Sequence, residues 1–278
     1  MAQLSFEFFP PKTAEGDQAL LKTATTLSEF NPEYFSVTFG AGGSTRVKTF
    51  ETVQAVKNHT NISVAPHISC IGASVEDIHS LLEQYQKSGI SRLVALRGDI
   101  PSGMGGTGAF RYAADLVQFI REQTGNHFSI EVGAYPEYHP EAKTPGDDFT
   151  HFVEKIKAGA NSAITQYFYN ADSYFAFVEA CQKEGLDIPI TPGIMPIMGY
   201  TQLARFSDNC GAEIPRWIRQ KLAAFEAKDD KASLKAFGIE VVTQLCERLL
   251  AANVPGLHFY TLNKYTTTQT ILKNLGLS

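Results

Sequence analysis

The sequence lacks the features that mark membrane, secreted and disulfide-rich proteins. No apolar run approaches the roughly 20 residues that a helix needs to cross a bilayer. Among 278 residues there are only 4 cysteines, at positions 70, 181, 210 and 246, and no CxxC pair. We therefore expect reduced, mostly buried thiols rather than a disulfide framework or a zinc site. The first residues, MAQLSFEFF, lack the basic start and cleavage site of a signal peptide, which predicts a cytoplasmic protein.

An excess of basic charge is also missing. The formal net charge is −5, which argues against nucleic acid or an anionic membrane as a partner. His67, His139 and His258 show no HxH or HExxH spacing, so no metal site is expected. There is no GxSxG elbow and no Cys/His arrangement, which disfavours nucleophilic hydrolysis. The composition, 44% hydrophobic and 19% charged, is that of an ordinary globular protein able to bury a core.

What the sequence does contain is a regular alternation of short apolar runs and helical periodicity. The expected strands are Leu4–Phe9, Tyr34–Phe39, Ile62–Pro66, Arg92–Leu96, Phe128–Ala134, Ser162–Phe168, Ile188–Ile194 and Leu257–Thr261. The expected helices include Ala19–Phe30, Val47–His59, Val75–Ser88, Ala109–Thr124 and Phe149–Ala158, with two or three more within Thr201–Ala252. Strands begin about 30 residues apart, the length of one strand–helix unit.

This alternation runs through residues 1–278 without a linker. It predicts an α/β fold with one domain, a single (β/α)₈ TIM barrel with extra helices before the last strand. Because periodicity does not show whether a sheet closes, a doubly wound open sheet is the alternative.

Glu7 is a charged residue inside the aromatic run LSFEFFPPKT. Pro10 and Pro11 cannot donate ladder hydrogen bonds, so the strand must end before them. A carboxylate among apolar neighbours loses solvation and becomes able to hold a proton near neutral pH. The alternative is that Glu7 faces solvent on an edge strand.

Polar and ionisable groups recur where the other expected strands end. In chain order they are Glu7, Thr38, His67, Arg97, Asp99, Tyr135, Gln166, Tyr260 and Lys264. In a barrel these ends meet at one face and form a ligand-binding mouth. Arg97 and Asp99 could instead form an ion pair in a surface turn. Lys264 could form a Schiff base as an aldolase lysine does, although it follows Asn263 in a loop.

Two glycine-rich segments need a separate interpretation. Gly103–Gly108 spells GxGxxG, but six residues separate it from the preceding strand, whereas a dinucleotide fingerprint begins in the turn directly after the strand. A flexible loop is the favoured interpretation. GAGGST, at residues 40–45, could hold a phosphate at a helix start, but a tight turn with Ser44 or Thr45 as the helix cap is favoured.

Taken together, the motifs at the strand ends resemble one known family. In order they are SFEFFPPKT, TFGAGGS, PHISC, ALRGD, EVGAYPEYHPEA, ITQYFY, GIMPI and FYTLNK. They closely resemble methylenetetrahydrofolate reductases of the bacterial type, from residue 4 to the C-terminus. The resemblance implies a barrel with non-covalent FAD that reduces 5,10-methylenetetrahydrofolate to 5-methyltetrahydrofolate. NADH or NADPH would be the co-substrate in a ping-pong scheme that supplies methyl groups for methionine synthesis.

The resemblance also implies roles for particular residues. Glu7 matches the general acid that protonates the folate nitrogen, and Asp99 matches a carboxylate near the flavin pyrimidine edge that also contacts the pterin. Further positions that match substrate contacts are Gln166, Gln202, Phe206, Tyr260 and Lys264. Positions that match FAD contacts are Thr38, His67, Arg97, Asp99, Tyr135, His139, Asp148 and Lys155. The expected partners are the folate and nicotinamide substrates, and the expected assembly is a homo-oligomer.

The sequence departs from the family pattern at two places. Lys264 stands where arginine is expected, which would remove bidentate binding of the folate tail. Tyr167 and Tyr169 stand where phenylalanines are expected. The end of the sequence just after the barrel predicts no regulatory domain. Two alternatives from other classes remain: a lyase or aldolase barrel that uses Lys264, and a non-catalytic barrel that binds flavin or folate.

Overall fold

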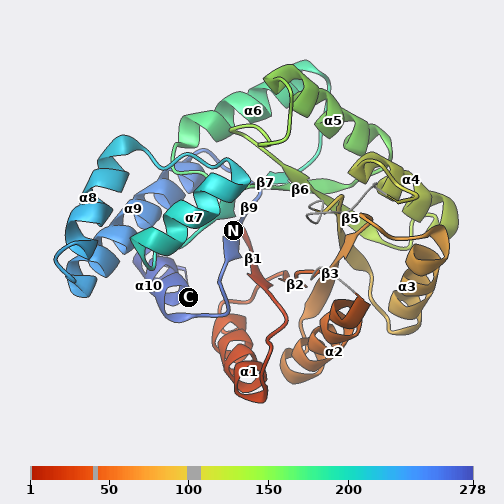
Figure 1. Ribbon diagram of the computed structural model, residues 1–278, viewed down its shortest axis with the longest axis horizontal. Coiled ribbons are helices and arrows are strands. Elements are labelled where there is room, and N and C mark those ends of the chain that lie inside the picture. Colours follow the sequence, from red (N-terminus) through yellow and green to blue (C-terminus); the bar gives the residue numbers. More distant parts are fainter. Residues whose placement is uncertain (1, 40–42, 99–107, 278) are drawn as a thin grey trace.

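Short parallel strands form one continuous sheet that curls into a barrel (Figure 1). The computed structural model describes residues 2–39, 43–98 and 108–277. The strands are β1 (Gln3–Phe8), β2 (Tyr34–Val37), β3 (Ser63–Ser69), β4 (Arg92–Leu96), β5 (Ser129–Ala134), β6 (Ser162–Thr165), β7 (Ile190–Thr191), β8 (Gly193–Ile194) and β9 (Gly256–Tyr260). Their order in the sheet is β7-β6-β5-β4-β3-β2-β1-β9-β8.

The barrel closes through its seventh strand, which the sequence predicts as one run over Ile188–Ile194. Pro192 divides that run into β7 and β8. β7 pairs with β6, and β8 pairs with β9, so the two halves of one strand join opposite edges of the sheet. The Pro192 carbonyl accepts the backbone N–H of His258 at 3.0 Å. The predicted barrel is confirmed, and the open-sheet alternative is wrong.

The helices surround the sheet, as Figure 1 shows. They are α1 (Ala14–Ser28), α2 (Gly43–Thr60), α3 (Val75–Lys87), α4 (Ala113–Thr124), α5 (Pro145–Lys157), α6 (Ala171–Lys183), α7 (Tyr200–Cys210), α8 (Arg216–Glu226), α9 (Lys231–Ala251) and α10 (Thr266–Asn274). α7, α8 and α9 fill the long interval before β9, as predicted. The residues after β9 form α10, which the periodicity did not indicate.

Local chemistry sets where the helices begin. Ser74 caps α3 in a reciprocal box with Asp77, and Thr144 caps α5 just before Pro145. The predicted helix over Ala109–Thr124 begins only at Ala113. The reason is that Asp115 Oδ2 accepts the backbone N–H groups of Arg111 at 2.8 Å and Tyr112 at 2.9 Å.

Alternation along β1 separates the two sides of the barrel wall. Phe6 and Phe8 are fully buried toward the helices, where the ring of Phe6 lies 6.1 Å from Phe35 and 5.9 Å from Phe259. Ser5 and Glu7 therefore point into the barrel. β1 pairs with β2 on one side and β9 on the other, so the alternative that Glu7 lies on an edge strand is wrong.

Two further expectations concern the whole chain. Cys70, Cys181 and Cys246 are buried free thiols, as predicted, and Cys210 is half-buried. Burial raises the pKa of the Cys181 thiol to about 11. Within the described ranges, no helix combines the length and the apolar character that crossing a membrane requires.

Candidate active site

Glu7 lies at the end of β1, between two imidazole rings from β3 and β9. Glu7 Oε2 is 3.3 Å from His67 Nε2 and 3.7 Å from His258 Nε2. His67 and His258 are buried, and both Nε2 atoms lack a hydrogen-bond partner within the described structure. The Glu7 side chain keeps 19% of its surface exposed, so it can be reached from the mouth. The expectation that Glu7 belongs to a site rather than to an exterior face is supported.

Burial shapes the titration of the groups around Glu7. It lowers the pKa of His67, while the charge of Glu7 works in the opposite direction. Burial also raises the pKa of Tyr260 well above its ordinary value, and Glu7 adds to that effect. Both neighbours are therefore neutral near pH 7.

A second cluster lies beyond β4 and β5. Arg97 donates to Glu141, and the backbone N–H of Glu141 donates to His139 Nδ1 at 3.1 Å. Asp148 Oδ2 accepts the backbone N–H of His139 at 3.0 Å. The rings of Tyr135 and His139 meet edge to face at 4.6 Å. The structure thus brings together four residues that the resemblance assigns to FAD, and Arg97 pairs with Glu141.

Lys155 from α5 completes this cluster. Its ammonium donates to the Gly133 carbonyl at the end of β5. Burial lowers the pKa of Lys155 to about 8, partly offset by the charge of Asp148. A half-buried cation beside Arg97 gives this side of the mouth a capacity to bind an anion.

Gln166 follows β6 and Tyr260 ends β9, the strands on either side of the divided seventh strand. The Gln166 backbone N–H continues the ladder to Ala134 O at 2.7 Å, and its side-chain Oε1 accepts the Tyr167 N–H at 3.0 Å. The Tyr260 hydroxyl donates to the Thr165 carbonyl at 2.7 Å, so its ring is fixed against β6. Tyr260 on β9 is paired in register with Glu7 on β1. Tyr260, a predicted substrate residue, therefore lies beside Glu7, whereas Gln166 stands at the end of β6.

Gln202 and Phe206 come from α7 and meet the loops after β8 and β9. They line a small pocket, about 10 Å³ in volume, together with Met195 and Leu262 among others. Lys264 is exposed in the turn that follows β9. The structure thus brings two predicted substrate residues, Gln202 and Phe206, into one pocket with Leu262 from the loop that carries Lys264.

The remaining predictions fall partly outside the described residues. Asp99, the glycines at 40–42 and most of the segment 103–108 lie there. Thr38 follows β2, and its backbone N–H donates to Phe8 O at 2.9 Å, which places it beside the end of β1. Tyr167 lies in the interior, where its hydroxyl bonds Ser207 Oγ at 2.9 Å, and Tyr169 donates to Met195 O at 3.3 Å.

Sequence patterns did not reveal which interior side chains surround Glu7. His258 was considered only as a metal ligand, and Ser5 was not considered. Ser5 Oγ lies 2.7 Å from His258 Nδ1, although the two residues are 253 positions apart. The sequence did contain one signal for this contact. Ser5 is two residues from Glu7 and His258 is two residues from Tyr260, so each shares an inward face of its strand with a predicted site residue. No group of three or more His, Cys, Asp or Glu side chains within the described ranges has a metal-binding arrangement.

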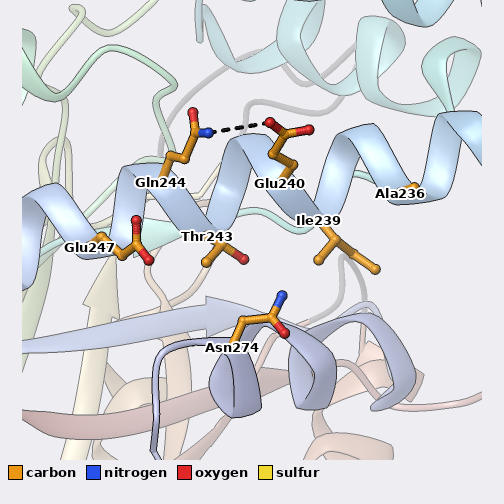
Figure 2. Close-up of a pocket in the computed structure, with 7 residues that line it drawn as sticks. All are labelled: Ala236, Ile239, Glu240, Thr243, Gln244, Glu247 and Asn274. Carbon is orange, nitrogen blue, oxygen red and sulfur yellow. Dashed lines mark hydrogen bonds between the residues drawn. The ribbon is translucent and has the colours of Figure 1, made fainter.

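A second cavity lies on the outer helices, away from the strand ends. A groove of about 440 Å³ runs between α9 and α10 and is lined by residues such as Glu240, Thr243 and Asn274. Figure 2 shows these side chains on the outer helices, with Gln244 bonded to Glu240. The residues that line this groove include no buried histidine and no strand end. The strand ends, where the titratable groups converge, are therefore the better candidate for the active site.

The chain is similar to known proteins along nearly its whole length. The family model described as methylenetetrahydrofolate reductase matches residues 1–276. The 5,10-methylenetetrahydrofolate reductase of Escherichia coli strain K12 is 38% identical over 274 residues, covering 99% of this chain and 90% of that protein. A probable methylenetetrahydrofolate reductase (NADH) of Oryza sativa subsp. japonica is 38% identical over 286 residues, covering 98% of this chain and 48% of that protein.

Solved structures show the same architecture. An uncharacterised protein from Clostridium thermocellum, which binds two copies of 5-methyl-5,6,7,8-tetrahydrofolic acid, has a TM-score of 0.64 at 18% identity. The match covers 99% of this chain and 94% of that chain. Likeness at this identity shows the fold alone.

Proposed function

The chain belongs to the methylenetetrahydrofolate reductase family, and from this premise we propose that it reduces 5,10-methylenetetrahydrofolate to 5-methyltetrahydrofolate. The electrons would come from NADH or NADPH and pass through FAD in a ping-pong scheme. The observation that carries the proposal is Glu7, a carboxyl group reachable from the mouth and flanked by two buried imidazoles. The reaction needs a proton at a folate nitrogen, and this is the group placed to give it.

The residues present fit an FAD molecule. Arg97 and Lys155 supply cations and hydrogen-bond donors of the kind that bind a pyrophosphate, and only one Lys155 donor is used, by the Gly133 carbonyl, within the described structure. Tyr135 and His139 supply ring faces and edges. Thr38, His67 and Asp148 complete the set that would hold the cofactor. When bound, FAD supplies a two-electron carrier between the nicotinamide and the folate.

We assign the folate side of the site to Glu7 and to residues that follow or end β6 and β9. Glu7 donates its proton to the nitrogen released when the methylene bridge opens to the iminium. Gln166 hydrogen-bonds the pterin, and the rings of Phe206 and Tyr260 provide apolar contact. Gln202 and Lys264 bind toward the tail, where a single ammonium replaces a bidentate guanidinium. Asp99, outside the described residues, is proposed to lie beside the flavin and the pterin.

The two competing functions are less well supported. A Schiff-base lysine is desolvated, whereas Lys264 is exposed. A non-catalytic barrel would not need a carboxyl group held between two buried imidazoles. In the favoured scheme, residues 1–278 act as one catalytic domain, the enzyme works in the cytoplasm as a homo-oligomer, and its product supplies methyl groups for methionine synthesis.

Anaerobic half-reactions test the proposal directly. The purified protein is expected to be yellow with non-covalent FAD, to be bleached by NADH or NADPH, and to regain colour when methylenetetrahydrofolate is added. Rates with the two nucleotides identify the physiological donor. A folded protein that stays colourless after reconstitution with FAD, or a bleached protein that methylenetetrahydrofolate does not reoxidise, would contradict the proposal.

A further inference from the structure

Helix α7 carries two of the residues proposed to contact folate. Gln202 and Phe206 are four positions apart, so they lie on one stripe of the helix, and both line the small pocket with Leu262. Leu203 and Ser207 form the adjacent stripe, and both are buried. Because the two stripes belong to one rigid helix, a contact that fixes Ser207 also fixes the direction of Gln202 and Phe206.

Ser207 is held by a side chain that follows β6. The Tyr167 hydroxyl oxygen lies 2.9 Å from Ser207 Oγ, and both residues are only 3% exposed. This distance is normal for a hydrogen bond between two hydroxyl groups, and burial keeps water from competing for it. Tyrosine stands at position 167 where the family pattern predicts phenylalanine, so this hydroxyl pair is a feature of this chain beyond that pattern.

Tyr167 also contacts other residues proposed for the folate side. It directly follows Gln166, whose side-chain Oε1 accepts the Tyr167 backbone N–H at 3.0 Å. The rings of Tyr167 and Tyr260 meet edge to face with centroids 6.4 Å apart. Tyr260 is itself fixed, because its hydroxyl donates to the Thr165 carbonyl at 2.7 Å. A single buried side chain therefore joins the end of β6, the end of β9 and α7.

Carboxylates from other elements hold the two ends of α7. Glu226 of α8 accepts the backbone N–H groups of Tyr200 at 3.1 Å and Thr201 at 3.2 Å, which satisfies donors that a helix start leaves free. Just beyond the helix, the Glu213 N–H donates to Glu137 Oε2 in the loop after β5 at 2.7 Å. These contacts hold the ends in place, and the buried hydroxyl pair adds the contact that fixes the rotation of α7 about its own axis.

We propose that Tyr167 is a positioning residue that, through its bond to Ser207, holds α7 in the orientation that binds folate. This inference rests on the proposed function, in which Gln202 and Phe206 contact the substrate. When a ligand binds only one orientation of a helix, the apparent dissociation constant is the intrinsic one divided by the fraction of molecules already in that orientation. The hydroxyl pair raises this fraction. It therefore tightens folate binding and takes no part in the chemical step.

Hydrogen exchange in the holoenzyme tests the anchoring of α7 without folate. Tyr167→Phe keeps the ring and removes the hydroxyl, and Ser207→Ala removes the same bond from the α7 side if the first variant does not fold. In each, the amides of residues 200–210 should exchange about fivefold faster, the factor expected for loss of one ordinary hydrogen bond. The double variant should exchange no faster than either single variant, because the two hydroxyls act only as a pair. Tyr174→Phe, which removes a buried hydroxyl bonded to Ile190 O at 2.8 Å, is the matched control and should leave these amides unchanged.

The folate half-reaction, measured over a range of methylenetetrahydrofolate concentrations, tests the consequence for binding. Tyr167→Phe should raise the apparent dissociation constant about fivefold and keep the rate at saturating folate within about twofold of wild type, the pattern of lost binding without lost chemistry. A slower saturated rate with unchanged affinity overturns the proposal, as do unchanged exchange in both variants or effects of the two substitutions that multiply. Wild-type protein that binds no folate would instead refute the proposed function itself, whereas tight folate binding that Tyr167→Phe leaves unchanged refutes this inference alone.

Discussion

At the scale of single residues, the surroundings of Glu7 separate two requirements of the reaction. The transfer of hydride from the nucleotide needs no proton from the protein, whereas opening of the methylene bridge does. Within the described part of the chain, the ionisable side chains paired with Glu7 are two imidazoles, and neither Arg97 nor Lys155 is among them. A change at Glu7 should therefore affect only one half of the cycle.

Glu7→Gln keeps the size of the side chain and removes its proton. We expect the nucleotide half-reaction to remain within a few-fold of wild type and the folate half-reaction to fall by about 10²–10⁴. Stopped-flow absorbance of the flavin measures both rates on one preparation. Glu179→Gln, on the exposed side of α6 where its side chain is 64% exposed, is the control and should change neither. A folate rate within a few-fold of wild type would remove Glu7 from the mechanism.

Burial of the Lys155 ammonium lowers the free energy of unfolding by an amount that depends on pH. Its pKa is about 8 in the folded protein against an ordinary 10.5. The unfolded chain therefore binds more protons between these values, and the stability contributed by this residue rises as pH rises from about 8 to 10.5. Below pH 8 the buried ammonium lowers the free energy of unfolding by at most about 3 kcal/mol.

Lys155→Met should remove this dependence. In flavin-free protein, the variant should gain stability relative to wild type near pH 7.5, and the gain should shrink toward pH 10. Urea unfolding at several pH values measures the difference in free energy. Lys157→Met, whose side chain on the same helix is 67% exposed, should show no such trend. A constant difference across the range would mean that Lys155 is not a desolvated cation.

At the scale of elements, the divided seventh strand decides how the barrel closes. Pro192 has no N–H to donate, so the ladder is interrupted there and restarts at Gly193. The Gly193 N–H donates to Thr165 Oγ1 at 2.9 Å. A Cβ on Gly193 would lie 2.1 Å from the Thr165 carbonyl oxygen and 2.7 Å from the Tyr260 ring. Glycine is therefore required at position 193, because the Thr165 carbonyl and the Tyr260 ring leave no room for a Cβ.

Gly193→Ala should destabilise the protein by about 1–3 kcal/mol and displace Tyr260. Chemical denaturation measures the first effect, and the folate half-reaction reports the second. Gly199→Ala is the matched control. A Cβ at Gly199 would meet nothing within 4 Å, and the backbone there is extended at φ −175, so little change is expected. Equal stability of the two variants would contradict the steric explanation.

At the scale of the whole molecule, the mouth is built from nearly every strand. Arg97 follows β4, Lys155 reaches the end of β5, and Thr38 follows β2. A ligand bound there contacts parts of the chain that come together only in the closed barrel. Binding should therefore stabilise the barrel as a unit and not one segment of it.

Addition of FAD to flavin-free protein should shift a single thermal transition upward. At 100 times the dissociation constant, binding stabilises by about 2.7 kcal/mol. For a chain of this size that corresponds to about 5–10 °C in the midpoint temperature. Differential scanning calorimetry measures the shift, with ATP at the same concentration as the control. A separate transition that does not move with FAD would show that part of the chain unfolds independently.

Sequence patterns predicted much of this architecture because neighbours along the chain control it. β4 was expected at its observed bounds, Arg92–Leu96, since a short apolar run between polar residues fits a buried strand. The division at Pro192 was not predicted. A proline in an apolar run does not show that the residues before it and after it will pair with different strands. The later start of α4 depends on the Asp115 carboxylate, which competes with continued helix for the same N–H groups.

By itself, the sequence determined the succession of strands and helices, the polar groups at the strand ends, and the position of Glu7 within β1. Only the tertiary structure decided what surrounds Glu7. Ser5 and His258 meet across 253 positions because β1 pairs with β9, and Tyr34 joins them because β2 pairs with the other side of β1. Alternation along a strand determines the face on which each side chain lies. The register between strands that are distant in sequence determines which side chains lie next to it. That register is set by how the whole barrel packs and closes.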